Sequence, residues 1–169
     1  MKSRIWLKMA GCVAILAGVP IIAATSAHAA TVVALGASNT YGKGVARNQA
    51  FPAQLEAILR AKGLNVHVIN AGINGDTTEG MLRRMDGVVS KGVSAVILQP
   101  GGNDRRKRSL DRTAEIQSRL SARGIPVILV PNNMFGGLPH QPDGQHLTPE
   151  GYHMLAESLA SQVAGAIGR

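Results

Sequence analysis

The sequence predicts an α/β fold in which a parallel sheet carries helices on both of its faces. Two observations lead to this prediction: several short runs are apolar throughout, and stretches with a helical spacing of apolar residues separate them. Strands that are apolar along their whole length are typical of parallel sheets, which are covered on both sides. With 169 residues, 45% of them hydrophobic and 17% charged, the chain has the length and composition of one globular domain.

The first half of the chain predicts two strands that alternate with two helices. Residues 31–36 are an apolar run that ends in glycine, as expected for a buried strand, and residues 51–63 place apolar side chains at helical spacing. Residues 65–70 predict the second strand. The helix after it begins at residues 76–79, which resemble a capping box with the carboxylate of Asp76 on the first free amides.

The second half continues the alternation. Residues 93–99 and 125–130 predict the third and fourth strands, with a less apolar helix at 110–124 between them. Thr148 has the character of an N-cap and Pro149 that of a first helical residue, so the last amphipathic helix is expected to begin there.

The loops at one edge of this sheet hold the unusual polar clusters. In open α/β sheets, ligands bind just beyond the carboxyl ends of the strands. That rule selects the loops 37–49, 71–76, 100–108 and 131–147, and each of them contains a cluster of polar side chains and glycines.

The N-terminal residues predict a segment that is cleaved off during export. Lys2, Arg4 and Lys8 precede an apolar run, and small residues follow up to position 29. This pattern describes a secretory signal peptide over residues 1–29. A retained membrane anchor is the alternative, but the apolar run is shorter than the ~20 residues of a spanning helix.

Cleavage would leave residues 30–169 as an exported domain, periplasmic or secreted, with no stable membrane span. It would contain no cysteine, because Cys12 is the only one in the chain. It would retain 15 Lys and Arg against 10 acidic residues, a net charge of +5, which favours anionic partners. Aromatic residues make up 3% of the chain, too few for a surface that stacks bases, so we expect no nucleic-acid partner.

The four polar loops contain the parts of a site for acyl transfer. A hydroxyl nucleophile needs a base, an anion that orients the base, and donors for the oxyanion that forms. Ser38 offers the nucleophile, His146 the base and Asp143 the anion. The backbone amides of Ser38 and Gly75 and the side-chain amide of Asn103 offer the donors. None of these loops is specific alone, but their occurrence in this order on an alternating fold is a sharper signal.

Taken together, the four blocks resemble the SGNH hydrolases, also called the GDSL family of esterases and lipases. The blocks are ALGASNTYG at 34–42, GDTT at 75–78, GGND at 101–104 and DGQH at 143–146. The chain is most similar to the small bacterial members of the thioesterase, lysophospholipase and arylesterase type. The resemblance implies a flavodoxin-like three-layer α/β/α sandwich, with residues 30–169 as the hydrolase-like domain.

The same resemblance implies a role for each site residue. Ser38 would be the nucleophile, His146 the base and Asp143 the orienting acid. The N–H groups of Ser38 and Gly75 and the Asn103 amide would form the oxyanion hole. The implied reaction hydrolyses a small acyl ester or thioester through an acyl-enzyme, with anionic lipid among the candidate substrates. It requires no cofactor and no metal.

The sequence departs from the family pattern at two places. Ala37 stands where the family usually has an acid, although that acid is not part of the triad. Asn103 and Asp143 are only 40 positions apart, whereas relatives commonly fit another helix and a fifth strand into this interval. We therefore expect a short, mainly parallel sheet of four to five strands, and it is an open question whether His146 reaches Ser38.

Other interpretations of the same residues stay open at this point. His140, Asp143 and His146 are spaced so that they could hold a zinc ion in a metallohydrolase. The shortened interval would also suit a relative that keeps the pocket without catalysis. The basic run at 105–108 is typical of a solvated turn, or of a cationic rim that draws anionic substrates.

Overall fold

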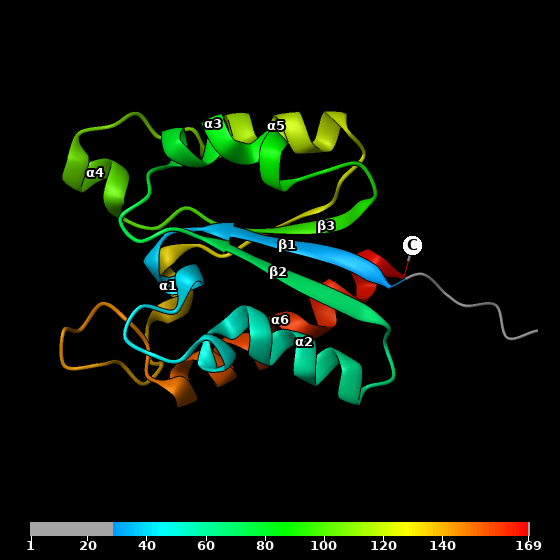
Figure 1. The fold of residues 1–169 in the computed structure, drawn as a ribbon. Helices are drawn as coiled ribbons and strands as arrows, with labels where there is room; N and C mark the ends of the chain where they lie inside the picture. The colour runs from blue at the N-terminus through cyan, green and yellow to red at the C-terminus, as the bar shows by residue number, and fades with distance from the viewer. Residues whose placement is uncertain (1–28, 169) are drawn as a thin grey trace, which may run out of the picture.

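The computed structural model describes residues 29–168 and shows three layers, with a sheet between two layers of helices (Figure 1). The predicted signal peptide lies outside the described residues except for its last position. All four strands are parallel and follow the order β2-β1-β3-β4. Their bounds are β1 (Ala30–Gly36), β2 (Val66–Gly72), β3 (Val93–Gln99) and β4 (Val127–Leu129). The predicted α/β fold is thus confirmed.

The helices divide between the two faces of the sheet. One layer consists of α2 (Phe51–Ala61) and α6 (Pro149–Ile167), and the other of α3 (Thr78–Val88) and α5 (Thr113–Ala122). Four short elements follow strands or loops: α1 (Ser38–Tyr41), α4 (Asn103–Lys107) and the 3-10 turns η1 (Arg47–Gln49) and η2 (Asn132–Phe135). None of the helices within residues 29–168 is both long and apolar enough to cross a bilayer.

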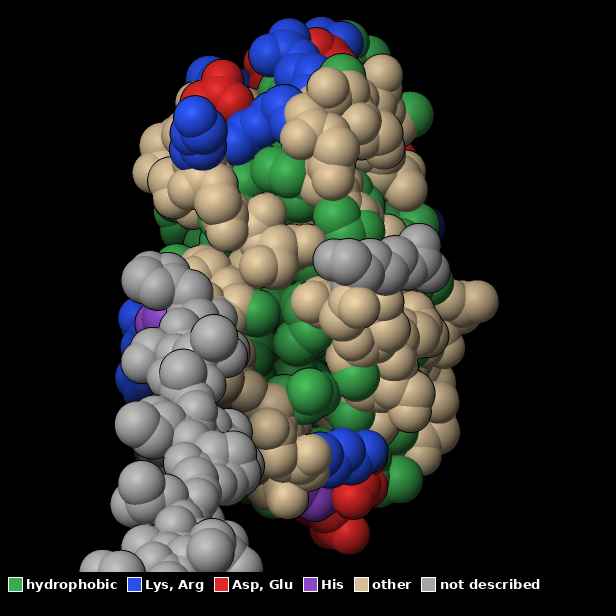
Figure 2. Space-filling model, turned by 90° about the vertical axis from the view of Figure 1, so that its right-hand side faces the viewer, with side chains coloured by type: hydrophobic (Ala, Val, Ile, Leu, Met, Phe, Trp, Pro, Cys, Tyr) green, Lys and Arg blue, Asp and Glu red, His purple; other side chains and the backbone are tan. Residues whose placement is uncertain are grey.

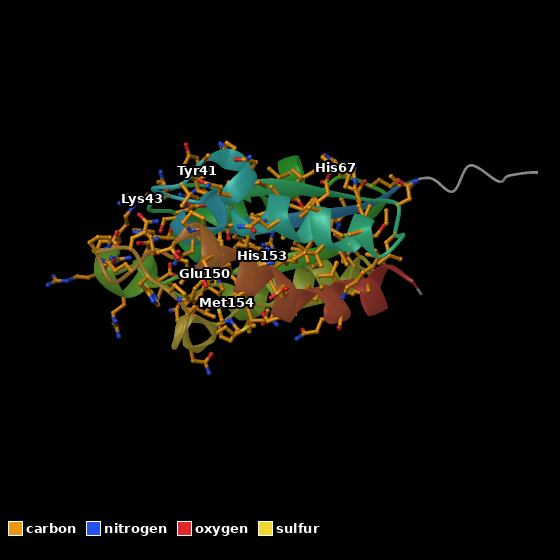
Figure 3. All side chains as sticks on the ribbon, turned by 90° about the horizontal axis from the view of Figure 1, so that it is seen from below. Tyr41, Lys43, His67, Glu150, His153 and Met154 are labelled. Atoms are coloured by element: carbon orange, nitrogen blue, oxygen red, sulfur yellow. The ribbon has the colours of Figure 1, made fainter. Side chains whose placement is uncertain are left out.

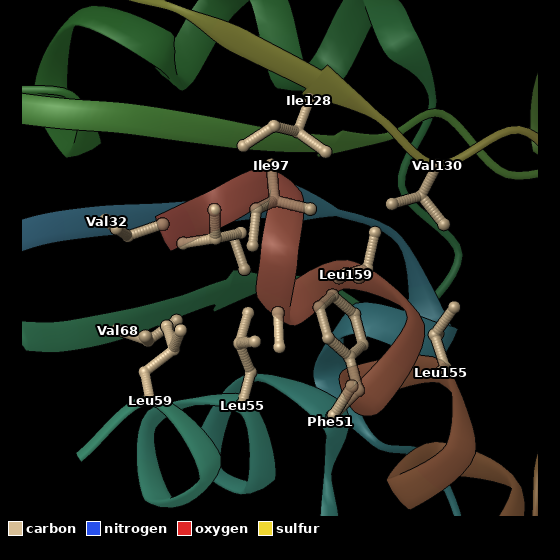
Figure 4. Packing of buried hydrophobic residues seen from close by; sticks show 14 of the residues in the cluster. Val32, Phe51, Leu55, Leu59, Val68, Ile97, Ile128, Val130, Leu155 and Leu159 are labelled. Atoms are coloured by element: carbon tan, nitrogen blue, oxygen red, sulfur yellow. The ribbon is translucent and has the colours of Figure 1, made fainter. Parts of the chain in front are cut away.

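Strand β1 explains why the predicted strands are apolar at every position. Val32 and Ala34 pack into the cluster under α2 and α6, while Val33 and Leu35 pack into the cluster under α3 and α5. Figure 4 shows the first cluster, with Phe51 of α2 close to the residues of α6. Fully burying one such side chain contributes about 1.5–3 kcal/mol. At the end of the sheet where the strands begin, apolar side chains fill the space between the layers (Figure 2).

Glycines end the two neighbouring strands β1 and β2 at the same level. Gly36 and Gly72 are register partners, and each lies where a side chain would overlap the α1 segment. A Cβ on Gly36 would overlap Thr40, and one on Gly72 would overlap the backbone of Tyr41. The absence of side chains lets the chain turn from β1 directly into α1. Ser38 is thereby placed at the carboxyl edge of the sheet.

Strand β4 is shorter than predicted and forms an edge of the sheet. It comprises Val127–Leu129, although single hydrogen bonds from Val96 N to Pro126 O and from Val130 N to Leu98 O extend the pairing. Between β4 and α6 the chain forms η2 and an isolated bridge between His140 and Leu147, and the described residues after β4 form no further strand. Of the predicted range of four to five strands, the described residues form four.

The packing of α6 gives a first testable prediction. Leu155 is 1% exposed in the core under α6, whereas Met154 beside it is 40% exposed (Figures 3 and 4). Leu155→Ala should lower the free energy of unfolding by about 2–5 kcal/mol, because it leaves a cavity in a packed cluster. Met154→Ala should change it by less than about 0.5 kcal/mol. Urea titrations of both variants provide the measurement, and equal losses would contradict this packing.

Candidate active site

A pocket of about 370 Å³ opens at the carboxyl edge of the sheet, where three of the four predicted loops meet. Its walls come from the turn after β1, the end of β3, α4, η2 and the loop before α6. Ser38, Asn103 and His146 are among the residues that line it. The fold therefore brings together three of the predicted site residues that are far apart in the sequence.

The turn that carries Ser38 is held by a buried side chain of β3. Gln99 is 1% exposed, and its Oε1 accepts hydrogen bonds from Ala37 N at 3.2 Å and from Thr40 Oγ1 at 3.1 Å. Because both donors flank Ser38, these bonds fix the backbone on either side of its side chain. Sequence reasoning missed Gln99, although a polar residue at the end of an otherwise apolar strand was a signal for it.

His146 links the serine to an acid in one line of hydrogen bonds. Its Nε2 lies 3.0 Å from Ser38 Oγ, and its Nδ1 lies 2.5 Å from Asp143 Oδ2. The ring is nearly enclosed, with 8% of the His146 side chain exposed, while 41% of the Asp143 side chain is exposed. The shortened interval before Asp143 does not keep the imidazole from the hydroxyl.

The second oxygen of Asp143 shapes the loop around the histidine. Asp143 Oδ1 accepts the N–H groups of Gln145 at 2.9 Å and of His146 at 3.0 Å. All three contacts stabilise the ionised carboxylate, and they lower the pKa of Asp143 well below its ordinary value of 3.8. The bond to the His146 ring is the largest cause, followed by the two backbone amides.

A chain of two further hydrogen bonds anchors this loop to α1 and α6. Asn39 Nδ2 donates to the carbonyl of Gln145 at 3.1 Å, and the hydroxyl of Tyr152 donates to Asn39 Oδ1 at 2.9 Å. Tyr152 is fully buried in α6, and its burial raises the pKa of its hydroxyl, which therefore remains a donor. The sequence pattern identified Tyr152 only as a core residue and gave no sign of this contact.

Asn103 is the first residue of α4 and is 6% exposed. Its Nδ2 donates to the carbonyl of Asp76 at 2.8 Å, and its Oδ1 accepts from Arg106 at 2.9 Å. Because an amide nitrogen carries two hydrogens, one remains for a group in the pocket. Gly75, at φ +73°, is not among the described residues that line the pocket, and its carbonyl accepts from Lys107 Nζ at 2.6 Å.

Asp76 in the GDTT block and Asp104 in the GGND block both have structural partners. The predicted cap at Asp76 is wrong, because the side chain of Thr77 caps α3 instead. Asp76 pairs with Arg84, at 2.8 Å from its Nε. Asp104 accepts the N–H of Thr78 at 3.0 Å, as expected for an acid that caps a helix. These contacts tie the second block to the third.

The zinc alternative finds no matching geometry. Within residues 29–168, no group of three or more His, Cys, Asp or Glu side chains is arranged to hold a metal ion. His140 lines the pocket, but its Nδ1 lies 2.7 Å from the carbonyl of Leu138. The structure therefore does not assemble His140, Asp143 and His146 as a set of ligands.

Known proteins match most of this chain. The model of the GDSL-like Lipase/Acylhydrolase family matches residues 34–164. Esterase TesA of Pseudomonas aeruginosa is 28% identical over 130 residues, which are 73% of this chain and 62% of that relative. The chain thus spans less than two thirds of the length of this curated relative.

Solved structures agree with the fold. AlinE4, described as an SGNH-hydrolase family esterase, is 25% identical with a TM-score of 0.53, over 83% of this chain and 98% of its own. The TesA structure is 23% identical with a TM-score of 0.66, over 80% and 99%. A carbohydrate acetylesterase family member from Sinorhizobium meliloti is 18% identical with a TM-score of 0.68, over 83% and 100%. The last two show that the fold is shared.

The lowered pKa of Asp143 predicts how stability depends on pH. A carboxyl group with a depressed pKa in the folded state stabilises the fold above its unfolded pKa, and this contribution disappears as pH falls through the folded pKa. Asp143→Asn keeps an acceptor for the two amides but places a donor against the His146 ring. The loss of unfolding free energy should therefore be constant above about pH 5 and should shrink below about pH 4.

Urea unfolding at pH 7, 5 and 3 measures this difference. Asp86→Asn is the matched control, because the Asp86 side chain is 78% exposed and pairs with Arg123 at 3.3 Å. The control should cost little at any of these pH values. A loss for Asp143→Asn that stays the same down to pH 3 would contradict the depressed pKa.

Proposed function

This chain belongs to the GDSL-like lipase/acylhydrolase family, and on that premise we propose that it is an exported serine hydrolase of acyl esters or thioesters. The observation that carries the proposal is the unbroken line of hydrogen bonds from Asp143 through His146 to Ser38 at the wall of a pocket. A nucleophile, a base and an orienting acid within hydrogen-bond reach are the arrangement that acyl transfer needs.

In the first step, Ser38 Oγ attacks the acyl carbon while His146 Nε2 takes its proton. Asp143 accepts from Nδ1 of the ring, which selects the tautomer with a free Nε2 and stabilises the imidazolium that forms. The tetrahedral oxyanion is stabilised by the N–H of Ser38 and the side-chain amide of Asn103. We propose the Gly75 N–H as the third donor, because its neighbour Asp76 already binds the Asn103 amide.

In the second step, His146 returns the proton to the departing alcohol or thiol, and the acyl group remains bonded to Ser38 Oγ. Water then attacks the acyl-enzyme while His146 again acts as base, and the acid is released as the serine is restored. The chain's own residues supply every proton transfer in this sequence.

The size of the pocket supports small substrates. A volume of about 370 Å³ suits a short acyl group with part of its leaving group. Anionic lipid remains within the proposal because cationic side chains line part of the pocket. Export to the periplasm or the medium is also part of the proposal and rests on the signal-like sequence of residues 1–29.

Covalent labelling tests the serine mechanism. A fluorophosphonate probe should label the folded protein, and digestion should place the modification on Ser38. Ser38→Ala should abolish labelling and the hydrolysis of a chromogenic short-chain ester, because no other hydroxyl replaces the attacking atom. Full activity in Ser38→Ala would refute the mechanism. A folded wild-type protein that is neither labelled nor active would instead indicate a non-catalytic binding relative.

The oxyanion role of Asn103 gives a second prediction. Asn103→Ala should lower turnover by roughly a hundredfold or more, because one donor to the oxyanion typically supplies about 3 kcal/mol. Asn132→Ala is the matched control: Asn132 lines the same pocket, and its Nδ2 donates to the carbonyl of Gly101 at 3.1 Å. Steady-state kinetics should show the larger loss in kcat for Asn103→Ala alone. Melting curves of both variants check that they remain folded. Equal losses in the two variants would argue against the assigned role.

A further inference from the structure

We propose that Arg105 and Arg106 form an anion subsite inside this pocket, so that its preferred esters carry a carboxylate or a phosphate close to the scissile bond. This inference rests on the proposed function of the pocket and names the substrate class. The starting observation is that both arginines line the pocket, whereas no Asp or Glu is among the described residues that line it.

The charge of these two side chains is not balanced by carboxylates. Arg105 makes neither a hydrogen bond nor an ion pair through its side chain within residues 29–168. Arg106 donates to two neutral amide oxygens, those of Asn103 at 2.9 Å and of Gln145. Six other arginines pair with carboxylates: Arg60, Arg83, Arg84, Arg112, Arg119 and Arg123.

The acids near the two arginines are Asp104, Asp111 and Asp143, and each already accepts a hydrogen bond from another group, Asp111 from the N–H of Thr113 at 2.8 Å. Asp104 accepts the N–H of Thr78, and Asp143 accepts from His146 and from two backbone amides. Within residues 29–168, no carboxylate forms an ion pair with Arg105 or Arg106. The pocket therefore presents two guanidinium groups whose charge is free to act on a ligand.

The position of Arg106 brings this charge to the reacting centre. Its guanidinium contacts Asn103, whose amide we assign to the oxyanion, and Gln145, the neighbour of His146. An anionic oxygen that replaced the Gln145 oxygen would keep a hydrogen bond to the guanidinium and add the attraction between two opposite full charges. The planar fork of a guanidinium also matches the two oxygens of a carboxylate or phosphate.

The rest of the basic run indicates a small anion rather than a long polyanion. Lys107 is bound to the carbonyl of Gly75, and Arg108 ends α4 in the left-handed region, at φ +53°. Neither of them lines the pocket, whereas Arg105 and Arg106 do. The charge of the run is thus divided: Arg105 and Arg106 face the site of chemistry, and the other two cations do not line it.

Pairs that consist of an anionic ester and its neutral counterpart test the subsite. On the acyl side, 4-nitrophenyl monosuccinate is compared with its methyl ester. On the leaving-group side, 4-acetoxybenzoate is compared with its methyl ester, and 4-acetoxyphenyl phosphate is compared with its neutral dimethyl ester. We expect the charged member of at least one pair to have a kcat/KM about tenfold higher at low salt, and the ratio to fall in 0.5 M NaCl. The favoured pair identifies the side and the kind of anion.

Variants of Arg105 and Arg106 test whether these side chains cause the preference for the charged ester. Arg105→Gln and Arg106→Gln should each lower the charged-to-neutral ratio several-fold, and the double variant should bring it close to one. Arg108→Gln is the matched control from the same run and should leave both the ratio and the activity on the neutral ester unchanged. A wild-type ratio of one or less in every pair would overturn the proposal. So would a ratio that survives in the double variant.

Binding separates this inference from the proposed function. The Ser38→Ala variant should bind the monosuccinate, or the favoured charged ester of the other pairs, about tenfold more tightly than its methyl ester in calorimetry. If the wild type hydrolyses no ester but this preference in binding persists, the hydrolase proposal fails and the anion subsite stands. If hydrolysis occurs without any preference in rate or binding, the subsite fails and the hydrolase proposal stands.

Discussion

The hydrogen bond between His146 Nε2 and Ser38 Oγ is the contact on which the proposed chemistry depends. It joins residues 108 positions apart, at a length of 3.0 Å. The contact is held from both ends: Gln99 fixes the turn of the serine, and Asn39 connects the loop of the histidine to the buried Tyr152 of α6. Since α6 packs on α2 in the core, the position of the imidazole is set by that packing rather than by the path of the chain after β4.

This explains how a shortened interval is compatible with an assembled site. In a parallel sheet every strand delivers its following loop to the same edge, so the number of strands between two loops matters less than the anchoring of each loop. The described sheet has four strands, and its last loop is anchored by Thr148, which caps α6 two residues after the histidine. Removing length between β4 and Asp143 therefore leaves the geometry at Ser38 intact.

The features that could be predicted from the sequence are those that local rules determine. Apolar runs gave the strands, and Thr148 with Pro149 gave the start of α6, because capping and periodicity involve neighbours in the chain. The partners of Gln99 and the Asn39–Tyr152 bond are tertiary contacts, so the sequence could mark Gln99 as an unusual polar residue but could not identify what it binds. The start of α3 shows where local rules are no longer sufficient. Asp76 and Thr77 are both good caps, but Asp76 pairs with Arg84 and Thr77 caps the helix.

The charge of the pocket depends on which of its ionised side chains are paired and which are not. The carboxylate of Asp143 is held ionised by three donors, so its charge is directed to the imidazole. Ala37 lines the pocket where the family block usually has an acid, and it contributes no charge there. With Arg105 and Arg106 on the facing α4, the balance of charge in the pocket is positive. In the proposed mechanism, a negative charge that develops or arrives beside Ser38 is therefore stabilised from α4 as well as by the proposed oxyanion donors.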